Sequence, residues 1–138
     1  MPLKIQAFCR ETQQPVPRKP GPIIRCVLES LALQCRKTLH EIEDLTGCQV
    51  ARPHLLNGSN NALLNHFTAN AVRCPLVAAP PDTTAVGNVI VQALALGHLE
   101  SLEQAREIVR NSFKTETLLP YAAAWDTAYD RFIQLRPS

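Results

Sequence analysis

The sequence predicts an α/β fold that is rich in helices and contains about two parallel strands. Apolar residues recur at spacings of three and four through most of the chain, which is typical of amphipathic helices. Two short segments, 48–56 and 74–80, depart from this pattern and favour strands. A helix separates them, so the crossover between them is expected to make the strands parallel. Two strands are few for a free-standing sheet, which indicates part of a larger one.

The first half of the chain is expected to consist of an arm and one long helix. Residues 1–22 contain Pro2, Pro15, Pro17, Pro20 and Pro22, so a loop or an extended arm without regular structure is expected there. The apolar spacing predicts one amphipathic helix from position 23 to about 45. Gly47 is well placed to end that helix in a left-handed conformation.

The middle of the chain is predicted to alternate between strand and helix. Residues 48–56 are a weaker strand prediction, because Pro53 argues against a central position in a sheet. A polar turn at 57–61 follows, and a helix that begins at Ser59 or Asn60 continues to about Val72. The apolar run 74–80 is bounded by prolines and suits a buried strand.

Three further helices are predicted towards the C-terminus. The first begins with Thr83 or Thr84 as its cap and ends at Gly97, and it is apolar on nearly every face, so it is expected to be internal. Ser101 and Gln104 form a capping-box pattern at the start of the second, 101–113.

The last predicted helix follows Pro120 and has an aromatic stripe made of Trp125, Tyr129 and Phe132. This stripe is interpreted as core packing. Asp126 and Asp130 share a face of the same helix and are interpreted as solvated rather than as a catalytic pair.

The composition is that of a folded protein without an obvious nucleic-acid or membrane partner. The net charge is +2, and 14 basic residues balance 12 acidic ones without forming a basic run. No apolar run is long enough for a membrane span, and no signal peptide is recognised, which favours the cytoplasm. The 5 cysteines contain no C-x-x-C pair and are expected to be free thiols. The 4 histidines lack ligand spacing, so no metal site is predicted.

Four motifs at compatible spacing give the sequence a family resemblance. They are "FCRETQQPVPRKPGPIIRCVLESLALQCRKTL", "NGSNNALLNHFTANA", "PPDTTAVGNVIVQALALG" and "AWDTAYDRF". From about Phe8 to Phe132 the chain resembles the C-terminal end of rhamnulokinases, which are sugar kinases of the FGGY family. The resemblance implies a partial actin-like (ribonuclease-H-like) ATPase domain, with 1–22 as a proline-rich arm and 23–136 as the distal part of the kinase C-terminal domain.

The resemblance also implies a function. Full-length members use ATP and Mg²⁺ to phosphorylate a ketose, here most simply L-rhamnulose, in a cleft between two domains. Their N-terminal portion supplies the phosphate-binding hairpin, the sugar contacts and the catalytic Asp, whereas the stretch present here supplies the adenosine pocket. No catalytic residue is therefore assigned to this chain, and it is expected to be inactive alone.

The candidate nucleotide-binding residues are Gly58, Ser59 and Asn61. They match the family's Gly-Gly-Gly-Ser-x-Asn turn, whereas Leu56 and Asn57 stand where that turn has its first two glycines. Missing glycines restrict backbone approach to a nucleotide. Two readings remain open: contact with ATP or ADP, or a capped junction between loop and helix without a ligand.

Other departures from the family pattern leave the function open. The family's Ala-Asp reads Ala69-Asn70, and Ala79 and Asp82 replace a Gly and a Glu in the motif that ends at Gly87-Asn88. Gly87 is interpreted as permitting close packing of its helix on the sheet. A truncated kinase domain, a stand-alone binding or interaction module, and an inactive structural fragment are all considered.

A homo-oligomer is expected. A chain that forms only part of a larger sheet leaves strand edges and apolar helix faces uncovered. A symmetric dimer is the commonest way to cover them. The long helix 23–45, the arm 1–22, or both are the expected contact surfaces.

Overall fold

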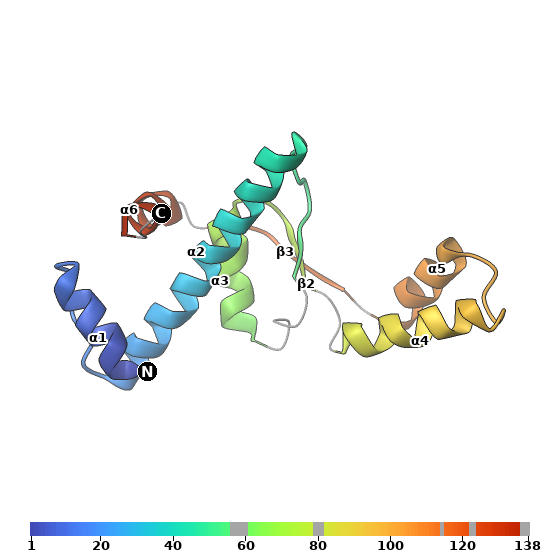
Figure 1. The fold of residues 1–138 in the computed structure, drawn as a ribbon, viewed down its shortest axis with the longest axis horizontal. Coiled ribbons are helices and arrows are strands. Elements are labelled where there is room, and N and C mark those ends of the chain that lie inside the picture. The colour runs from blue at the N-terminus through green and yellow to red at the C-terminus, as the bar shows by residue number, and fades with distance from the viewer. Residues whose placement is uncertain (56–60, 79–81, 114, 122–123, 136–138) are drawn as a thin grey trace.

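The computed structural model describes residues 1–55, 61–78, 82–113, 115–121 and 124–135. Within these ranges the chain forms six helices and three short strands, which confirms the α/β class (Figure 1). In chain order they are α1 (Pro2–Glu11), α2 (Pro20–Thr46), β1 (His54–Leu55), α3 (Ala62–Val72), β2 (Leu76–Ala78), α4 (Thr83–Ala95), α5 (Leu102–Ser112), β3 (Glu116–Leu118) and α6 (Trp125–Leu135).

The sheet has the order β1-β2-β3 and is mixed. The pair β1–β2 is parallel, as predicted, and aligns Leu55 with Ala78. The third strand, β3, was not predicted. It runs antiparallel to β2 and aligns Leu118 with Leu76 and Glu116 with Ala78. Because β3 is only three residues long and has no apolar run, no periodicity could reveal it.

The long helix α2 confirms the prediction for 23–45 and begins three residues earlier, at Pro20. Proline is tolerated in a first helical turn because its missing N–H has no partner there. Gly47 ends the helix with φ 67°, the predicted left-handed conformation, and its N–H donates to the Glu43 carbonyl at 2.8 Å.

The expectation that residues 1–22 lack regular structure was wrong, because α1 occupies Pro2–Glu11. The reason lies in where the prolines fall. Pro2 sits in the first turn, which tolerates proline, and the next proline is Pro15, so the segment between them is free to be helical.

Helix α3 lies between two small hydrophobic clusters. On the helical side, Ala71 packs with residues of α2 and α6, and the aromatic side chains of that layer close over it. On the sheet side, Ala69 packs with Leu76, Ala78 and Leu118. Ala69 and Ala71 are both fully buried. The prediction for this helix was correct in place, although its cap is Asn61 rather than Ser59 or Asn60.

The aromatic stripe of α6 is core packing, as predicted. Trp125 is buried, its ring centroid lies 5.3 Å from that of Phe67 on α3, and Tyr129 and Phe132 pack against the same cluster. The Tyr129 hydroxyl lies 3.2 Å from His40 Nδ1 on α2. These contacts hold α6 against α2 and α3.

The interpretation of Asp126 as simply solvated was wrong. Its Oδ1 accepts from Arg36 at 2.8 Å, and its Oδ2 accepts from Arg73 at 2.5 Å. The Arg36 side chain is only 13% exposed, and its guanidinium lies 4.2 Å from the centre of the Tyr129 ring. Asp126 therefore joins the start of α6 to α2 and to the end of α3. Asp130 forms no ion pair among the described residues.

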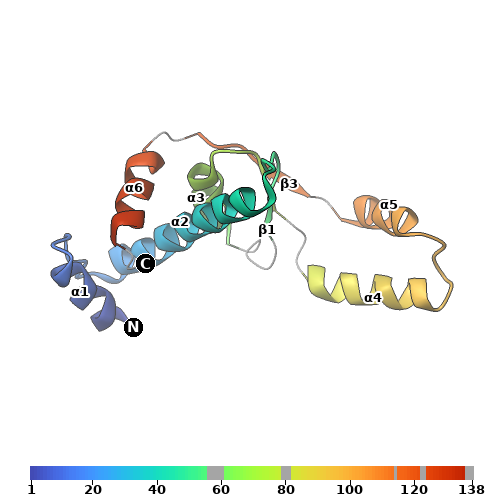
Figure 2. The same ribbon diagram turned by 45° about the horizontal axis from the view of Figure 1, so that its top comes forward.

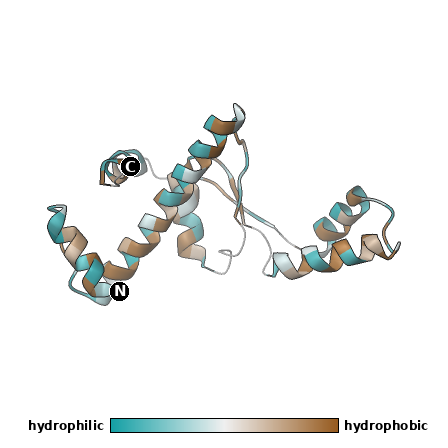
Figure 3. Cartoon of the chain, in the orientation of Figure 1, coloured by the Kyte–Doolittle hydropathy of each residue, from teal (hydrophilic) through white to brown (hydrophobic). Residues whose placement is uncertain are grey.

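Helices α4 and α5 lie apart from the other helices in both views of the chain (Figures 1 and 2). The prediction that α4 is internal was wrong, since it has no buried residue, and Val89 and Val91 are each 65% exposed. Much of α4 has hydrophobic colours in Figure 3. The capping prediction for α5 was correct, because Ser101 Oγ accepts the Gln104 N–H at 3.2 Å.

None of the helices in the described part of the chain combines the length and the apolar character that crossing a bilayer requires.

The double ion pair of Asp126 leads to a prediction about acid stability. The hydrogen bond from Arg36, together with the charge of Arg73, lowers the pKa of Asp126 from its ordinary value. A lowered folded-state pKa means that the contribution is present above the unfolded pKa and is lost as the pH falls through the folded one, below about pH 4. We expect Asp126→Asn to lower Tm by about 2–5 °C at pH 7 and much less at pH 3.

Thermal denaturation followed by circular dichroism at the two pH values measures this effect. Asp130→Asn is the matched control, because it makes the same change on the same helix without removing an ion pair. Equal losses of Tm for the two variants at pH 7 would contradict the structural role of Asp126.

Candidate functional site

The parallel pair of strands brings two motif segments to one edge of the sheet. Leu55 and Ala78 are aligned partners at the carboxyl ends of β1 and β2. The chain leaves β1 towards α3 and leaves β2 towards α4, so both segments emerge at this edge and both helices begin beyond it. In α/β proteins the carboxyl ends of parallel strands are the usual location of a ligand site.

Asn61 is the candidate residue whose position the structure describes. It caps α3 from an extended conformation, and its Oδ1 accepts the Leu64 N–H at 3.0 Å. Its carbonyl oxygen accepts the Asn65 N–H, also at 3.0 Å. The side-chain oxygen of Asn61 therefore has a structural partner, and its amide group remains the part that would donate to a ligand.

The other two candidates, Gly58 and Ser59, lie outside the described residues. They belong to the segment that joins Leu55 to Asn61, directly before the N-terminus of α3. The first turn of a helix has N–H groups without intrahelical partners and the positive end of the dipole, which together favour anions. Contact of Gly58 and Ser59 with a nucleotide stays a prediction.

The start of α4 differs from its sequence interpretation in two respects. The cap is Asp82, which has φ 61° and makes no side-chain capping bond, rather than Thr83 or Thr84. At Gly87, an added Cβ would meet nothing within 4 Å, so this glycine does not permit a close contact with the sheet. The interpretation of Gly87 as a packing residue was therefore wrong.

Asn70 has a structural role that the sequence did not reveal. Its side chain is almost fully buried, and its Oδ1 accepts the Tyr121 N–H at 2.8 Å, 51 positions away in the chain. An amide accepts this bond without placing a charge in the interior, which an ionised Asp would do. The hydrogen bond ties the segment after β3 to the C-terminal part of α3.

One residue at the site edge was missed from the sequence. Glu116 is exposed and pairs with Ala78, so β3 adds a carboxylate at the edge where the two motif segments emerge. A carboxylate there accepts hydrogen bonds from hydroxyl or amino groups and repels phosphates. The edge is therefore better suited to the nucleoside part of a nucleotide than to its phosphates. Because β3 itself was not predicted, no local signal pointed to this residue.

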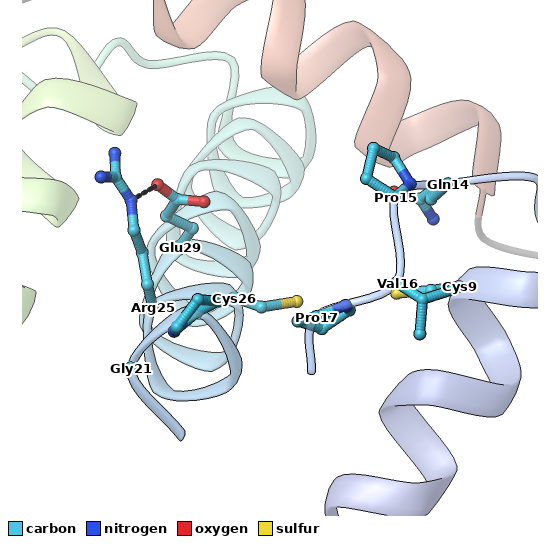
Figure 4. Close-up of a pocket in the computed structure, with 10 residues that line it drawn as sticks. Cys9, Gln14, Pro15, Val16, Pro17, Gly21, Arg25, Cys26 and Glu29 are labelled. Carbon is cyan, nitrogen blue, oxygen red and sulfur yellow. Dashed lines mark hydrogen bonds and ion pairs between the residues drawn. The ribbon is translucent and has the colours of Figure 1, made fainter. Parts of the chain in front are cut away.

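A cavity of about 530 Å³ lies elsewhere, between α1, the proline-rich segment and the start of α2 (Figure 4). Cys9 and Cys26 both border it, and all five cysteines are free, as predicted. Burial raises the pKa of Cys26, and the neighbouring Cys9 raises it further, so the Cys26 thiol is mostly protonated at neutral pH. Asn61, the candidate that the structure describes, does not line this cavity.

The described residues contain no group of three or more His, Cys, Asp or Glu side chains that could hold a metal ion.

Comparison with known proteins places this chain in a family. The C-terminal domain of the FGGY family of carbohydrate kinases matches residues 2–96. The protein named Rhamnulokinase in Bacteroides thetaiotaomicron is 42% identical over 130 residues, which are 93% of this chain and 27% of that protein. The Rhamnulokinase of Enterococcus faecalis is 40% identical over 116 residues, 82% of this chain and 24% of its own length.

A third relative, the Rhamnulokinase of Enterobacter sp. strain 638, is 35% identical over 123 residues, 88% of this chain and 25% of that protein. The chain thus spans about a quarter of the length of the curated relatives it matches. Since the family match covers more than half of the residues, the chain belongs to the FGGY family of carbohydrate kinases and contains C-terminal domain sequence of that family.

Proposed function

We propose that this chain is the nucleotide-side portion of a rhamnulokinase, with an incomplete actin-like ATPase fold. The single observation that supports it best is the 42% identity to a Rhamnulokinase over 93% of the chain. In the complete enzyme the reaction would be transfer of the γ-phosphoryl group of ATP to L-rhamnulose, with Mg²⁺ neutralising the phosphates. Residues 23–136 would form the distal part of the C-terminal domain, and the division from 1–22 stays a prediction.

The proposed contribution of this chain is to hold adenosine. The turn at Gly58 and Ser59 would offer backbone N–H groups, and the Asn61 amide would donate from the first turn of α3. Support comes from the alignment of Leu55 with Ala78, which leads both motif segments away from one edge of the sheet. The exposed Glu116 at that edge favours the nucleoside over the phosphates.

The proposed chemistry needs groups beyond those assigned to residues 1–138. By resemblance to the family, the catalytic Asp, the sugar contacts and the phosphate-binding hairpin come from the N-terminal portion of a full-length kinase. Phosphoryl transfer depends on positioning and charge neutralisation, so a chain without these groups would bind but not catalyse.

A stand-alone binding or interaction module is the second candidate. Replacement of the family's glycines by Leu56 and Asn57 favours it, because Leu rarely adopts the conformations that glycine allows. The hydrogen bond from the Tyr121 N–H to the buried Asn70 also favours it, since an amide here stands where the family has a carboxylate.

Residues 1–138 are expected to show no rhamnulokinase turnover by themselves, because the proposed catalytic Asp lies outside them. A coupled assay of ADP release with L-rhamnulose and Mg·ATP measures this, and the Rhamnulokinase of Bacteroides thetaiotaomicron is the positive control. Turnover above the enzyme-free background that grows in proportion to the concentration of this chain would contradict the prediction.

Adenosine and ADP are expected to bind weakly and with similar affinity, because the base and ribose supply most of the contacts. Isothermal titration calorimetry with each ligand measures this. Asn61→Asp retains an oxygen that caps α3 and removes the amide donor, so we expect it to weaken ADP binding at least threefold without lowering Tm.

Two comparisons give this titration its controls. Asn61→Ala removes the cap as well and should cost about 1 kcal/mol of stability, whereas Ser101→Ala removes a cap on α5, away from the site, and should leave binding unchanged. If millimolar adenosine or ADP produced neither heat nor a thermal shift, the turn would have no remaining nucleotide function.

We also propose that the chain self-associates through exposed apolar helix faces. Ile24 on α2 is 58% exposed, and Val89 and Val91 on α4 are each 65% exposed. Light scattering at micromolar concentration should give twice the chain mass of 15.3 kDa. Ile24→Glu and the double change Val89→Glu, Val91→Glu test the two helices separately. A cooperatively melting monomer would contradict self-association.

A further inference from the structure

A second concave surface lies at the opposite end of α2 from Gly47, where three helices meet. It is a groove of about 930 Å³, formed by one face each of α1, α2 and α6. Ala128, Arg131 and Leu135 of α6 line it, together with Ala124 directly before the helix, at the spacing of a single helical face. Volumes of this size are typical of small-molecule sites. The groove lies outside the candidate nucleotide edge and is not used by the proposed kinase function.

The walls of the groove are mainly apolar. Ile5 and Phe8 line it from α1, Leu33 from α2, and Ala128 and Phe132 from α6. Phe8 borders the groove and is 45% exposed, so a large aromatic surface stays in contact with water. An occupant with an apolar body would remove this surface from water, which is favourable.

The charges around the groove are unbalanced in favour of cations. Lys4 on α1 and Arg131 on α6 both border it, are exposed, and form no ion pair with a described residue. The carboxylate on the same surface, Glu29, is already paired with Arg25 at 2.7 Å. The groove therefore combines an apolar floor with two cations whose charge is not compensated.

We propose that the α1–α2–α6 groove binds an amphipathic monoanion, a molecule with an apolar chain and one carboxylate. The chain would lie against Phe8, Leu33 and Phe132, and the carboxylate would lie among Lys4 and Arg131 at the rim. A nucleotide is a poor fit, because its polar base would face apolar walls.

Dodecanoate, used below its micellar concentration, is the probe. Titration calorimetry with the full 138-residue chain should give one site, with binding at least tenfold tighter than that of dodecyltrimethylammonium, which has the same chain and the opposite charge. Lys4→Gln and Arg131→Gln should each weaken dodecanoate about three- to tenfold. Arg52→Gln, which removes an exposed cation outside the groove, is the matched control and should have no effect.

Two variants test the groove itself. Ala128→Phe places a ring inside it and should weaken dodecanoate more than tenfold. Thr127→Trp adds bulk at the exposed border and tests the same point if the first variant does not fold. The double change Val89→Ser, Val91→Ser on α4 should leave dodecanoate binding unchanged, because those side chains lie outside the groove.

Several results would overturn the proposal. They are equal binding of the cationic and anionic probes, several equivalents bound per chain, unchanged binding in both bulky variants, and loss of binding in the α4 variant. Light scattering with saturating dodecanoate should leave the mass unchanged, since separation of a dimer would identify a second copy as the occupant. Co-sedimentation with phosphatidylglycerol vesicles without binding of monomeric dodecanoate would identify a lipid surface instead.

Discussion

The fold of this chain depends on the packing of α3, which is covered by the sheet on one side and by α2 and α6 on the other. A helix between a sheet and two other helices needs small side chains where its neighbours approach, and the fully buried Ala69 and Ala71 meet that need on opposite sides. Polar groups in the same interior need partners. The Thr68 hydroxyl donates to the Leu64 carbonyl at 2.8 Å, and Asn70 accepts the Tyr121 N–H. Because α3 contacts every layer, its position determines those of β2, α2 and α6.

The same helix joins the core to the candidate site. Asn61 caps one end of α3, next to the proposed nucleotide turn, while the other end, at Arg73, contributes to the ion pair with Asp126. Any ligand that contacts Asn61 therefore acts on the helix around which the interior is built. Membership of the FGGY family is consistent with this arrangement, because kinases that close around a nucleotide need rigid elements behind their binding loops.

Features that depend on neighbouring residues in the chain could be predicted from short sequence patterns. Apolar spacing indicated α2, Gly47 indicated its end, and Ser101 indicated the start of α5, because each signal lies within a few residues of the structure that it determines. The features that were missed depend on distant partners. Asp126 binds Arg36 across 90 positions, and the partner of Asn70 is a backbone group 51 positions away.

Helix α4 shows a different limit of prediction. Its apolar composition indicates the surroundings that the helix needs, but these 138 residues leave Val89 and Val91 exposed. At the candidate site, sequence reasoning identified Asn61 but not Glu116, because a strand of three residues leaves no periodic signal.

Because Ala78 pairs with Glu116, residues 79–115 connect two neighbouring strands of the sheet. The two ends of this region meet as neighbours on adjacent antiparallel strands, so the whole of α4 and α5 is the loop of a single β-hairpin. The entropy lost on closing a loop rises only with the logarithm of its length, so a loop this long is only slightly harder to close than a shorter one. The pairing of β2 with β3 therefore tolerates a change in the length of this insertion at little entropic cost. The part of the chain that contains the buried core and the region of α4 and α5 are thereby joined at one pair of residues.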